Sequence, residues 1–303
     1  MDTIVKRIQE FVSSDSVQNL TEYHNAWLGC PNKPIVTNLV QLEKMGENEL
    51  GIGVNCSEYA KVSQNKLTRH INFQENLFKR LTNLDPSVLQ FPNGLGIRGK
   101  SDDKNVIPVT AYRLGYYYSH IYQIAKSNPT KRLSVLEIGG GFGALCYITQ
   151  KNLQVLSRYT IIDIPSALVN IAYVLGTYGI SFRFWNEPAN GETIVLGIPT
   201  DIENITECDI VISTACLPEL PTRIIDYYLA NIVRINPDYV YVDYTNACNG
   251  VYLGNQMQKV FDQRFKLILD QVTPINCYMC PYFDDESYGM QETVKEKMFS
   301  KAN

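Results

Sequence analysis

The sequence lacks the features that mark membrane, secreted and nucleic-acid-binding proteins. No apolar run approaches the roughly 20 residues of a membrane-spanning helix, and the amphipathic first residues lack the apolar core of a signal peptide. Basic residues are not in excess, because the net charge is −4 and the pI is near 5.5, whereas a general nucleic-acid binder needs a basic face. We therefore expect a cytoplasmic protein with no membrane span and no nucleic-acid partner.

A second pair of closely spaced cysteines is also missing. Cys277 and Cys280 form the one close pair among eight cysteines, and no nearby histidine supplies the further ligands that a zinc site needs. The other six lie in apolar or loop contexts, where a free cysteine packs as a small hydrophobe. We predict reduced thiols and no metal site.

The stretch from 133 to 165 predicts a strand, a glycine-rich turn, a helix and a second strand. Leu133 to Ile138 has the length and side-chain branching of a buried parallel strand. Four glycines follow it: Gly139, Gly140, Gly141 and Gly143. Glycine adopts backbone angles closed to other residues and lets a ligand approach the main chain. The predicted helix, from Ala144 to about Leu156, turns its free N–H groups and positive dipole end toward that ligand.

Two classes of cofactor use such a turn. Gly139-x-Gly141-x-x-Ala144 satisfies the dinucleotide fingerprint, and an acid two residues before the first glycine, here Glu137, also begins the loop of S-adenosylmethionine (SAM) methyltransferases. The Glu137 carboxylate suits a cofactor with an ammonium and a sulfonium group, and it would repel a pyrophosphate. The second predicted strand ends in Asp163, placed to accept hydrogen bonds from both ribose hydroxyls of either cofactor, with Ile164 beside it as a further contact.

Three segments resemble the sugar O-methyltransferase family, a branch of the class I SAM-dependent enzymes associated with polysaccharide and glycan modification. They are V-L-E-I-G-G-G-F-G-A-L, Y-T-I-I-D-I-P-S-A-L and D-I-V-I-S-T-A-C-L-P-E-L-P, within residues 111–252. The first segment is common to the class I superfamily, and only the three together point to the sugar branch.

The resemblance implies an α/β fold and a reaction. The fold is a Rossmann-like, doubly wound, mostly parallel sheet of seven strands, with residues 110–303 as the SAM-binding domain. Outside the resemblance, the helical patterns of residues 1–109 predict a mainly helical cap. The expected reaction transfers a methyl group from SAM to a hydroxyl of a sugar or glycan. An NAD(P)-dependent oxidoreductase on the same sheet and a SAM-binding module without turnover remain the alternatives.

Glu219 and His120 are the candidate general bases, because a sugar hydroxyl is a weak nucleophile. Glu219 follows the predicted strand 209–213, where a doubly wound sheet places its ligand crevice, and the sugar family has a similar acid there. An acid that complements a helix dipole is the alternative for Glu219. His120 lies on the predicted helix 110–125, two turns after Arg113 and on the same face. We expect Arg113 to bind the methionyl carboxylate of SAM. For Arg113 and His120 alike, the alternative is a side chain that only packs against its neighbours.

Three further candidates depend on where strands lie. The third strand is either 181–185 or 193–198, and in the second case Asp201 falls where the class often places an adenine contact. Tyr244 and Asn246 stand at the end of the predicted strand 239–244, so we expect them to contact the acceptor. The charged tail from Asp284 onward is expected to fray.

Overall fold

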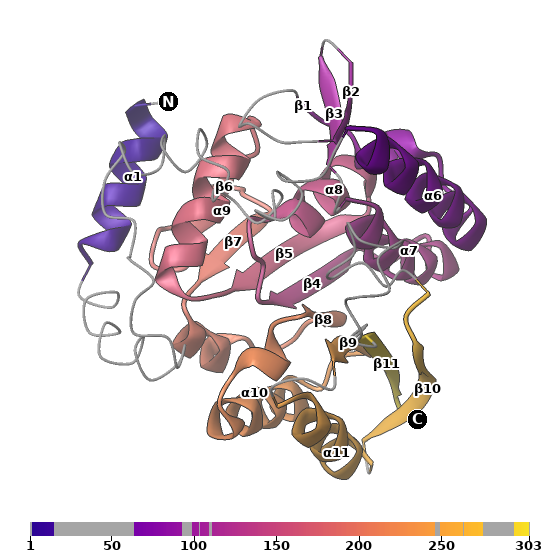
Figure 1. Cartoon of the computed structure of the whole chain (residues 1–303). Helices are drawn as coiled ribbons and strands as arrows, with labels where there is room; N and C mark the ends of the chain where they lie inside the picture. The colour runs from indigo at the N-terminus through magenta and orange to yellow at the C-terminus, as the bar shows by residue number, and fades with distance from the viewer. Residues whose placement is uncertain are drawn as a thin grey trace.

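The structure is a computed structural model of the 303-residue chain. It describes residues 2–14, 64–92, 99–102, 104–108, 111–245, 249–262, 264–274 and 294–302. Figure 1 shows one large sheet with helices packed on it. Its strands lie in the order β10-β11-β9-β8-β4-β5-β7-β6.

The sheet is mostly parallel. Its strands are β4 (Leu133–Ile138), β5 (Leu156–Ile162), β6 (Phe182–Phe184), β7 (Ile194–Gly197), β8 (Ile210–Thr214), β9 (Tyr239–Thr245), β10 (Phe265–Val272) and β11 (Val294–Lys301). Only β11 runs against its neighbours, β9 and β10. The chain builds outward from β4 on one side and returns to β8 on the other, which makes the carboxyl ends of β4 and β8 the topological switch point. The predicted Rossmann-like α/β fold is confirmed.

The sheet differs from the predicted one by an added strand. Both candidates for the third strand form: β7 is hydrogen-bonded to β5, and β6 pairs with β7 at the edge. The described sheet therefore has eight strands instead of seven.

The expectation that the C-terminal tail frays is wrong for its last residues. Residues 294–301 form β11, which is inserted between β9 and β10. The lysines and the glutamate of this segment are not typical of a buried strand, so the sequence pattern did not predict it. In the structure Glu296 is buried and accepts hydrogen bonds from Tyr116, Tyr241 and Gln271. A charged residue that is fully hydrogen-bonded can lie inside a sheet.

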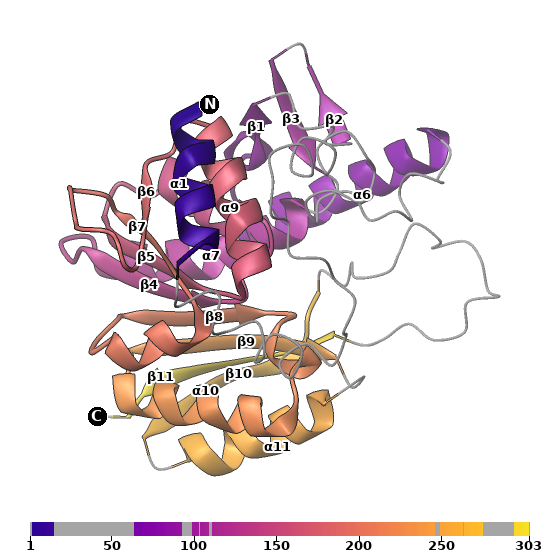
Figure 2. The same cartoon turned by 90° about the vertical axis from the view of Figure 1, so that its left-hand side faces the viewer.

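Helices cover both faces of the sheet (Figure 2). The first face carries α7 (Ala111–Ser127), α8 (Ala144–Asn152) and α9 (Pro165–Thr177), and the second carries α10 (Thr222–Ile235) and α11 (Gly250–Phe261). Successive side chains of a strand point to opposite faces, so Val135 packs in the first layer and Leu136 in the second. Burial on both faces explains why the parallel strands are mostly apolar instead of alternating strictly between apolar and polar residues.

The described part of residues 1–109 is helical with one small sheet. It contains α1 (Asp2–Val12), α6 (Gln64–Thr82), the short 3₁₀ helix η1 (Pro86–Leu89), and β1 (Phe91–Pro92), β2 (Gly99–Ser101) and β3 (Asn105–Pro108). Helix α1 packs along α9. Its Phe11 also stacks on Phe184 of β6, with ring centroids 4.0 Å apart. Helix α6 packs against α7. Within the described residues, no helix combines the length and apolar character of a membrane span.

Candidate active site

The glycine-rich turn lies at the carboxyl end of β4, as predicted. Gly139, Gly141 and Gly143 have φ values of +83°, +60° and +81°, which other residues rarely adopt. Gly143 is the N-cap of α8, so the unpaired N–H groups of that helix open at the turn.

The glycines differ in what surrounds them. A Cβ atom built on Gly139 would lie 2.2 Å from Cβ of Cys216, and one built on Gly140 would lie 2.5 Å from Cγ2 of Ile161. Among the residues that the structure describes, no heavy atom lies within 4 Å of a Cβ built on Gly141. The turn is therefore packed by the protein on one side and open at Gly141, where a ligand can approach the main chain.

Glu137 is buried between the sheet and α8, below this turn. Its side chain is 2% exposed, and its Oε2 accepts a hydrogen bond of 2.9 Å from the hydroxyl of Tyr159. Burial, and after it the charge of Asp163, raise the pKa of Glu137 to about 8 against the lowering effect of the Tyr159 hydrogen bond. A positive group on a ligand near Glu137 would stabilise its ionised form.

Asp163 ties the end of β5 to the glycine turn. One carboxylate oxygen accepts a hydrogen bond of 2.7 Å from the N–H of Ile164, and the other accepts one of 3.3 Å from the N–H of Gly141. Burial raises the pKa of Asp163 to about 6, and the nearby charge of Glu219 raises it too. The structure therefore brings Asp163 and Ile164 to the turn and places Glu219 within electrostatic reach.

Asp201 lies at the end of the neighbouring strand. It belongs to the 3₁₀ helix η2 (Pro199–Asn204), and its carboxylate accepts a hydrogen bond of 2.8 Å from the N–H of Ile198. Ile162 of β5 pairs with Gly197 of β7, so Asp163 and Asp201 follow adjacent strand ends. Burial raises the pKa of Asp201 to about 6.

Glu219 is the last residue of the turn that follows β8. We call this segment, residues 214–219, the 214–219 turn. Its last three residues form the 3₁₀ helix η3 (Leu217–Glu219), where the N–H of Glu219 donates to the carbonyl of Cys216 over 3.0 Å. Glu219 is exposed, whereas burial raises the pKa of the Cys216 thiol, as do the charges of Asp163 and Glu219. The turn thus carries an exposed carboxylate beyond the carboxyl end of β8.

Arg113 lies near Asp243, a residue that the sequence interpretation missed. Its charge favours the ionised form of Asp243, whose pKa burial raises, and its guanidinium carbon is 5.7 Å from the ring centroid of Tyr117. Asp243 is near the carboxyl end of β9, where it pairs with Thr214 of β8. The alternation of the strand is the signal that identifies it, since Asp243 points to the α7 face and Tyr244 to the other.

His120 is not brought to Glu219. Its ring packs on Tyr116 and Tyr241, with centroids 4.8 and 4.9 Å away, and its Nε2 is 3.9 Å from Oε2 of Glu296. Burial lowers the pKa of His120. His120 lies two turns, about 10 Å, from Arg113 along α7, and these contacts place it over the middle of strands β9 and β11.

The two predicted acceptor contacts are not at the glycine turn as the structure describes it. Tyr244 is 5% exposed and packs beneath α11, where its hydroxyl lies 3.1 Å from the position that a Cβ of Gly254 would occupy. The sheet therefore separates its ring from the turn. Asn246 lies outside the described residues.

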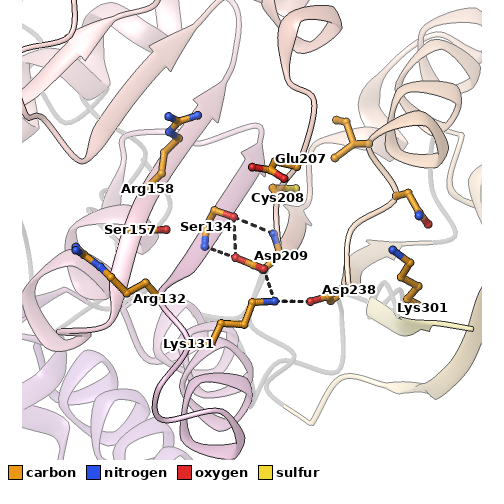
Figure 3. Close-up of a pocket in the computed structure, with 12 residues that line it drawn as sticks. Lys131, Arg132, Ser134, Ser157, Arg158, Glu207, Cys208, Asp209, Asp238 and Lys301 are labelled. Atoms are coloured by element: carbon orange, nitrogen blue, oxygen red, sulfur yellow. Dashed lines mark hydrogen bonds and ion pairs between the residues drawn. The ribbon is translucent and has the colours of Figure 1, made fainter. Parts of the chain in front are cut away.

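A polar hollow of about 630 Å³ lies at the opposite, amino ends of the strands (Figure 3). Lys131 bridges Asp209 and Asp238 with Nζ–O distances of 2.5 and 2.7 Å, and Asp209 also accepts hydrogen bonds from the N–H and hydroxyl of Ser134. Open α/β sheets bind ligands at the carboxyl ends of their strands. We therefore interpret this hollow as a surface where ion pairs hold the amino ends of the strands together, and not as the ligand site. Across the described ranges, no three His, Cys, Asp or Glu side chains gather as a metal site would require.

Glu137 gives a prediction on pH and stability. The folded chain holds the Glu137 proton up to a pKa of about 8, whereas the unfolded chain releases it near 4.5. The free energy of unfolding should therefore fall as pH rises through this window, by up to about 1.4 kcal/mol per pH unit. Glu137→Gln keeps the acceptor for Tyr159 and should flatten that slope in urea unfolding curves measured from pH 5 to 8. Glu207→Gln, an exposed change at the opposite pole, is the control; an unchanged slope in Glu137→Gln would contradict the assignment.

Comparison with known proteins gives similarity in structure alone. No family model matches the sequence, and a search of curated proteins finds no match. Among solved structures, the chain is similar to the methyltransferase domain of bacterial CtHen1, with 16% identity over 62% of this chain and 97% of that one and a TM-score of 0.43. It is also similar to a proposed RNA methyltransferase from Pyrococcus horikoshii (15% identity, 75% and 100% covered, TM-score 0.42) and to a ribosomal protein methylase from Lactobacillus delbrueckii (12% identity, 73% and 84% covered, TM-score 0.40).

Proposed function

We propose that the chain binds SAM at the glycine turn and transfers its methyl group to a hydroxyl of a sugar or glycan. The assignment of SAM as the cofactor depends on the open space at Gly141 and on three carboxyl groups near the glycine turn, Glu137, Asp163 and Glu219. The charges of Asp163 and Glu219 favour a positive ligand, and such a ligand would also favour the ionised form of Glu137, which holds its proton in the ligand-free chain. SAM carries an ammonium and a sulfonium group, whereas the pyrophosphate of NAD would be repelled.

The proposed cofactor contacts follow the geometry of the crevice. The turn and the first N–H groups of α8 receive the methionyl part, and Arg113 binds its carboxylate. Asp163 and Ile164 hold the ribose, and Asp201 borders the adenine because it follows the strand next to β5. We assign this binding to residues 110–303 and acceptor recognition to the cap, 1–109.

Glu219 is our proposed general base. When bound, SAM supplies an electrophilic methyl group, and the chain must aim a hydroxyl oxygen in line with the carbon–sulfur bond. Glu219 is exposed beyond the carboxyl end of β8 and would take the hydroxyl proton as the oxygen–methyl bond forms and the methyl–sulfur bond breaks, which leaves the sulfur as a neutral thioether. His120 is left out of this step, since its ring packs against Tyr116 and Tyr241, over the middle of strand β9.

The proposal of a sugar acceptor depends on the three sequence segments that resemble the sugar branch. The test therefore includes other classes of acceptor. Transfer of a labelled methyl group from SAM is measured with glycan, RNA and protein mixtures. We expect label in the glycan fraction. Label only in RNA or protein would overturn the acceptor, and SAM binding without transfer to any fraction would favour the binding module.

Glu219→Gln tests the base. We expect turnover to fall about 100-fold, while the Kd of S-adenosylhomocysteine (SAH) changes less than about threefold, because the variant keeps the glycine turn. Glu207→Gln makes the same chemical change at the opposite pole and should leave both values unchanged. Full turnover in Glu219→Gln would remove Glu219 from the mechanism without touching the cofactor assignment.

A further inference from the structure

The 214–219 turn contains a backbone conformation that needs outside support. Ala215 has a φ of +55°, in the left-handed region that residues with a side chain rarely adopt. The other described non-glycine residues with positive φ, Asn83 and Asn236, are of a type that tolerates it. Alanine has no polar side chain that could hydrogen-bond locally, so the surroundings must hold this turn.

Asp243 supplies that support from the neighbouring strand. The N–H of Ala215 donates a hydrogen bond of 2.5 Å to Oδ1 of Asp243, and the hydroxyl of Tyr117 donates to Oδ2. Asp243 is 0% exposed, and the charge of Arg113 favours its ionised form. A buried carboxylate with these partners is a strong and well-oriented acceptor.

The turn that Asp243 holds carries two parts of the proposed site. Cys216 packs so closely on Gly139 that a Cβ there would overlap its own Cβ. The carbonyl of Cys216 accepts the N–H of Glu219, whose charge reaches Asp163. A change at Ala215 is therefore transmitted both to the cofactor loop and to the acid.

We propose that Asp243 is a positioning residue, which holds Ala215 in its left-handed conformation and thereby sets Cys216 against Gly139 and Glu219 beside Asp163. The inference rests on the proposed function for the roles of Gly139 and Glu219. The hydrogen-bonded turn itself does not depend on those roles.

The test follows the accessibility of Cys216 in the folded protein. Alkylation by iodoacetamide is timed by mass spectrometry, with Cys146 and Cys208 as internal references, and the Kd of SAH is measured on the same samples. In Asp243→Ala, we expect Cys216 to react about tenfold faster with Cys146 and Cys208 unchanged, because only the 214–219 turn opens. SAH binding should weaken about fivefold, because Gly139 loses its packing partner.

Two further variants separate positioning from general support of the fold. Asp243→Asn keeps an oxygen acceptor for the N–H of Ala215, so its Cys216 rate should stay within about twofold of wild type. Adding Ala215→Gly to Asp243→Ala should bring the Cys216 rate back to within about threefold of wild type, because glycine adopts the angle unaided. Equal acceleration at all three cysteines, or no rescue by glycine, would show that Asp243 supports only the fold.

Hydrogen exchange of the wild-type Ala215 amide gives an answer even where Asp243→Ala does not fold. We expect this amide to exchange as slowly as those of β8, and exchange at the rate of a free turn amide would overturn the proposal. The two proposals fail in different ways. Absence of SAH binding by wild type would end the proposed function and leave the alkylation readout intact, whereas normal SAH binding with an unchanged Cys216 rate in Asp243→Ala would end this one.

Discussion

Gly141→Ala is expected to leave the chain folded and to weaken SAH binding at least about tenfold. Its new Cβ would meet no atom of the described residues within 4 Å, so we expect the cost in stability to come from the positive φ, about 1–2 kcal/mol. The same Cβ would project into the space where we place the methionyl part of the cofactor. Calorimetric titration gives the Kd, and urea unfolding gives the stability.

Gly139→Ala is the matched variant with the opposite expected outcome. Its Cβ would lie 2.2 Å from Cβ of Cys216, on a residue with φ of +83°. Overpacking of a dense site costs about 1–3 kcal/mol, and the backbone strain adds to it. We therefore expect the larger loss of stability in Gly139→Ala. Unchanged SAH binding in folded Gly141→Ala would show that the open side of the turn is not the cofactor site.

Asp163→Ala is expected to weaken SAH binding about 100-fold. In the proposed site this carboxylate accepts both ribose hydroxyls, and hydrogen bonds to a charged group contribute about 1.5–3 kcal/mol each. The binding form is the ionised one, and the pKa of Asp163 is raised to about 6. The affinity of wild type should therefore fall as the pH drops below about 6, and that part of the pH dependence should vanish in the variant.

Asp238→Ala is the control for this measurement. It removes an aspartate that pairs with Lys131 at the opposite pole of the sheet, where no cofactor contact is proposed. Its SAH affinity should equal that of wild type. An equal loss in both variants would point to a general effect on folding, and no loss in Asp163→Ala would remove the ribose contact from the proposed site.

The part of the fold around the cofactor loop was predictable because its signals are local. The apolar run of β4 and the glycines after it follow from backbone rules, and the observed strand spans the predicted residues. The position of Asp163 follows from the strand–helix–strand order. Each of these inferences needed only neighbouring residues.

The rest depended on contacts that are distant in the sequence. Strand β11 is rich in charge, and only the hydrogen bonds of Tyr116, Tyr241 and Gln271 to Glu296 explain its burial. The sequence predicted that Arg113 and His120 share one face of a helix. The direction of α7 along the sheet decides which of the two lies near the carboxyl ends of the strands, and this is Arg113. Asp243 was overlooked because its significance arises from the N–H of Ala215 on another strand.

The central claim is that the glycine turn binds SAM, and titration of the wild-type protein with SAH and with NADH tests it most directly. SAH shares the ribose, adenine, ammonium and carboxylate groups of SAM, so we expect micromolar binding of SAH and no binding of NADH under the same conditions. Binding of NADH alone would contradict the account, because the carboxylates at the turn would then face a pyrophosphate.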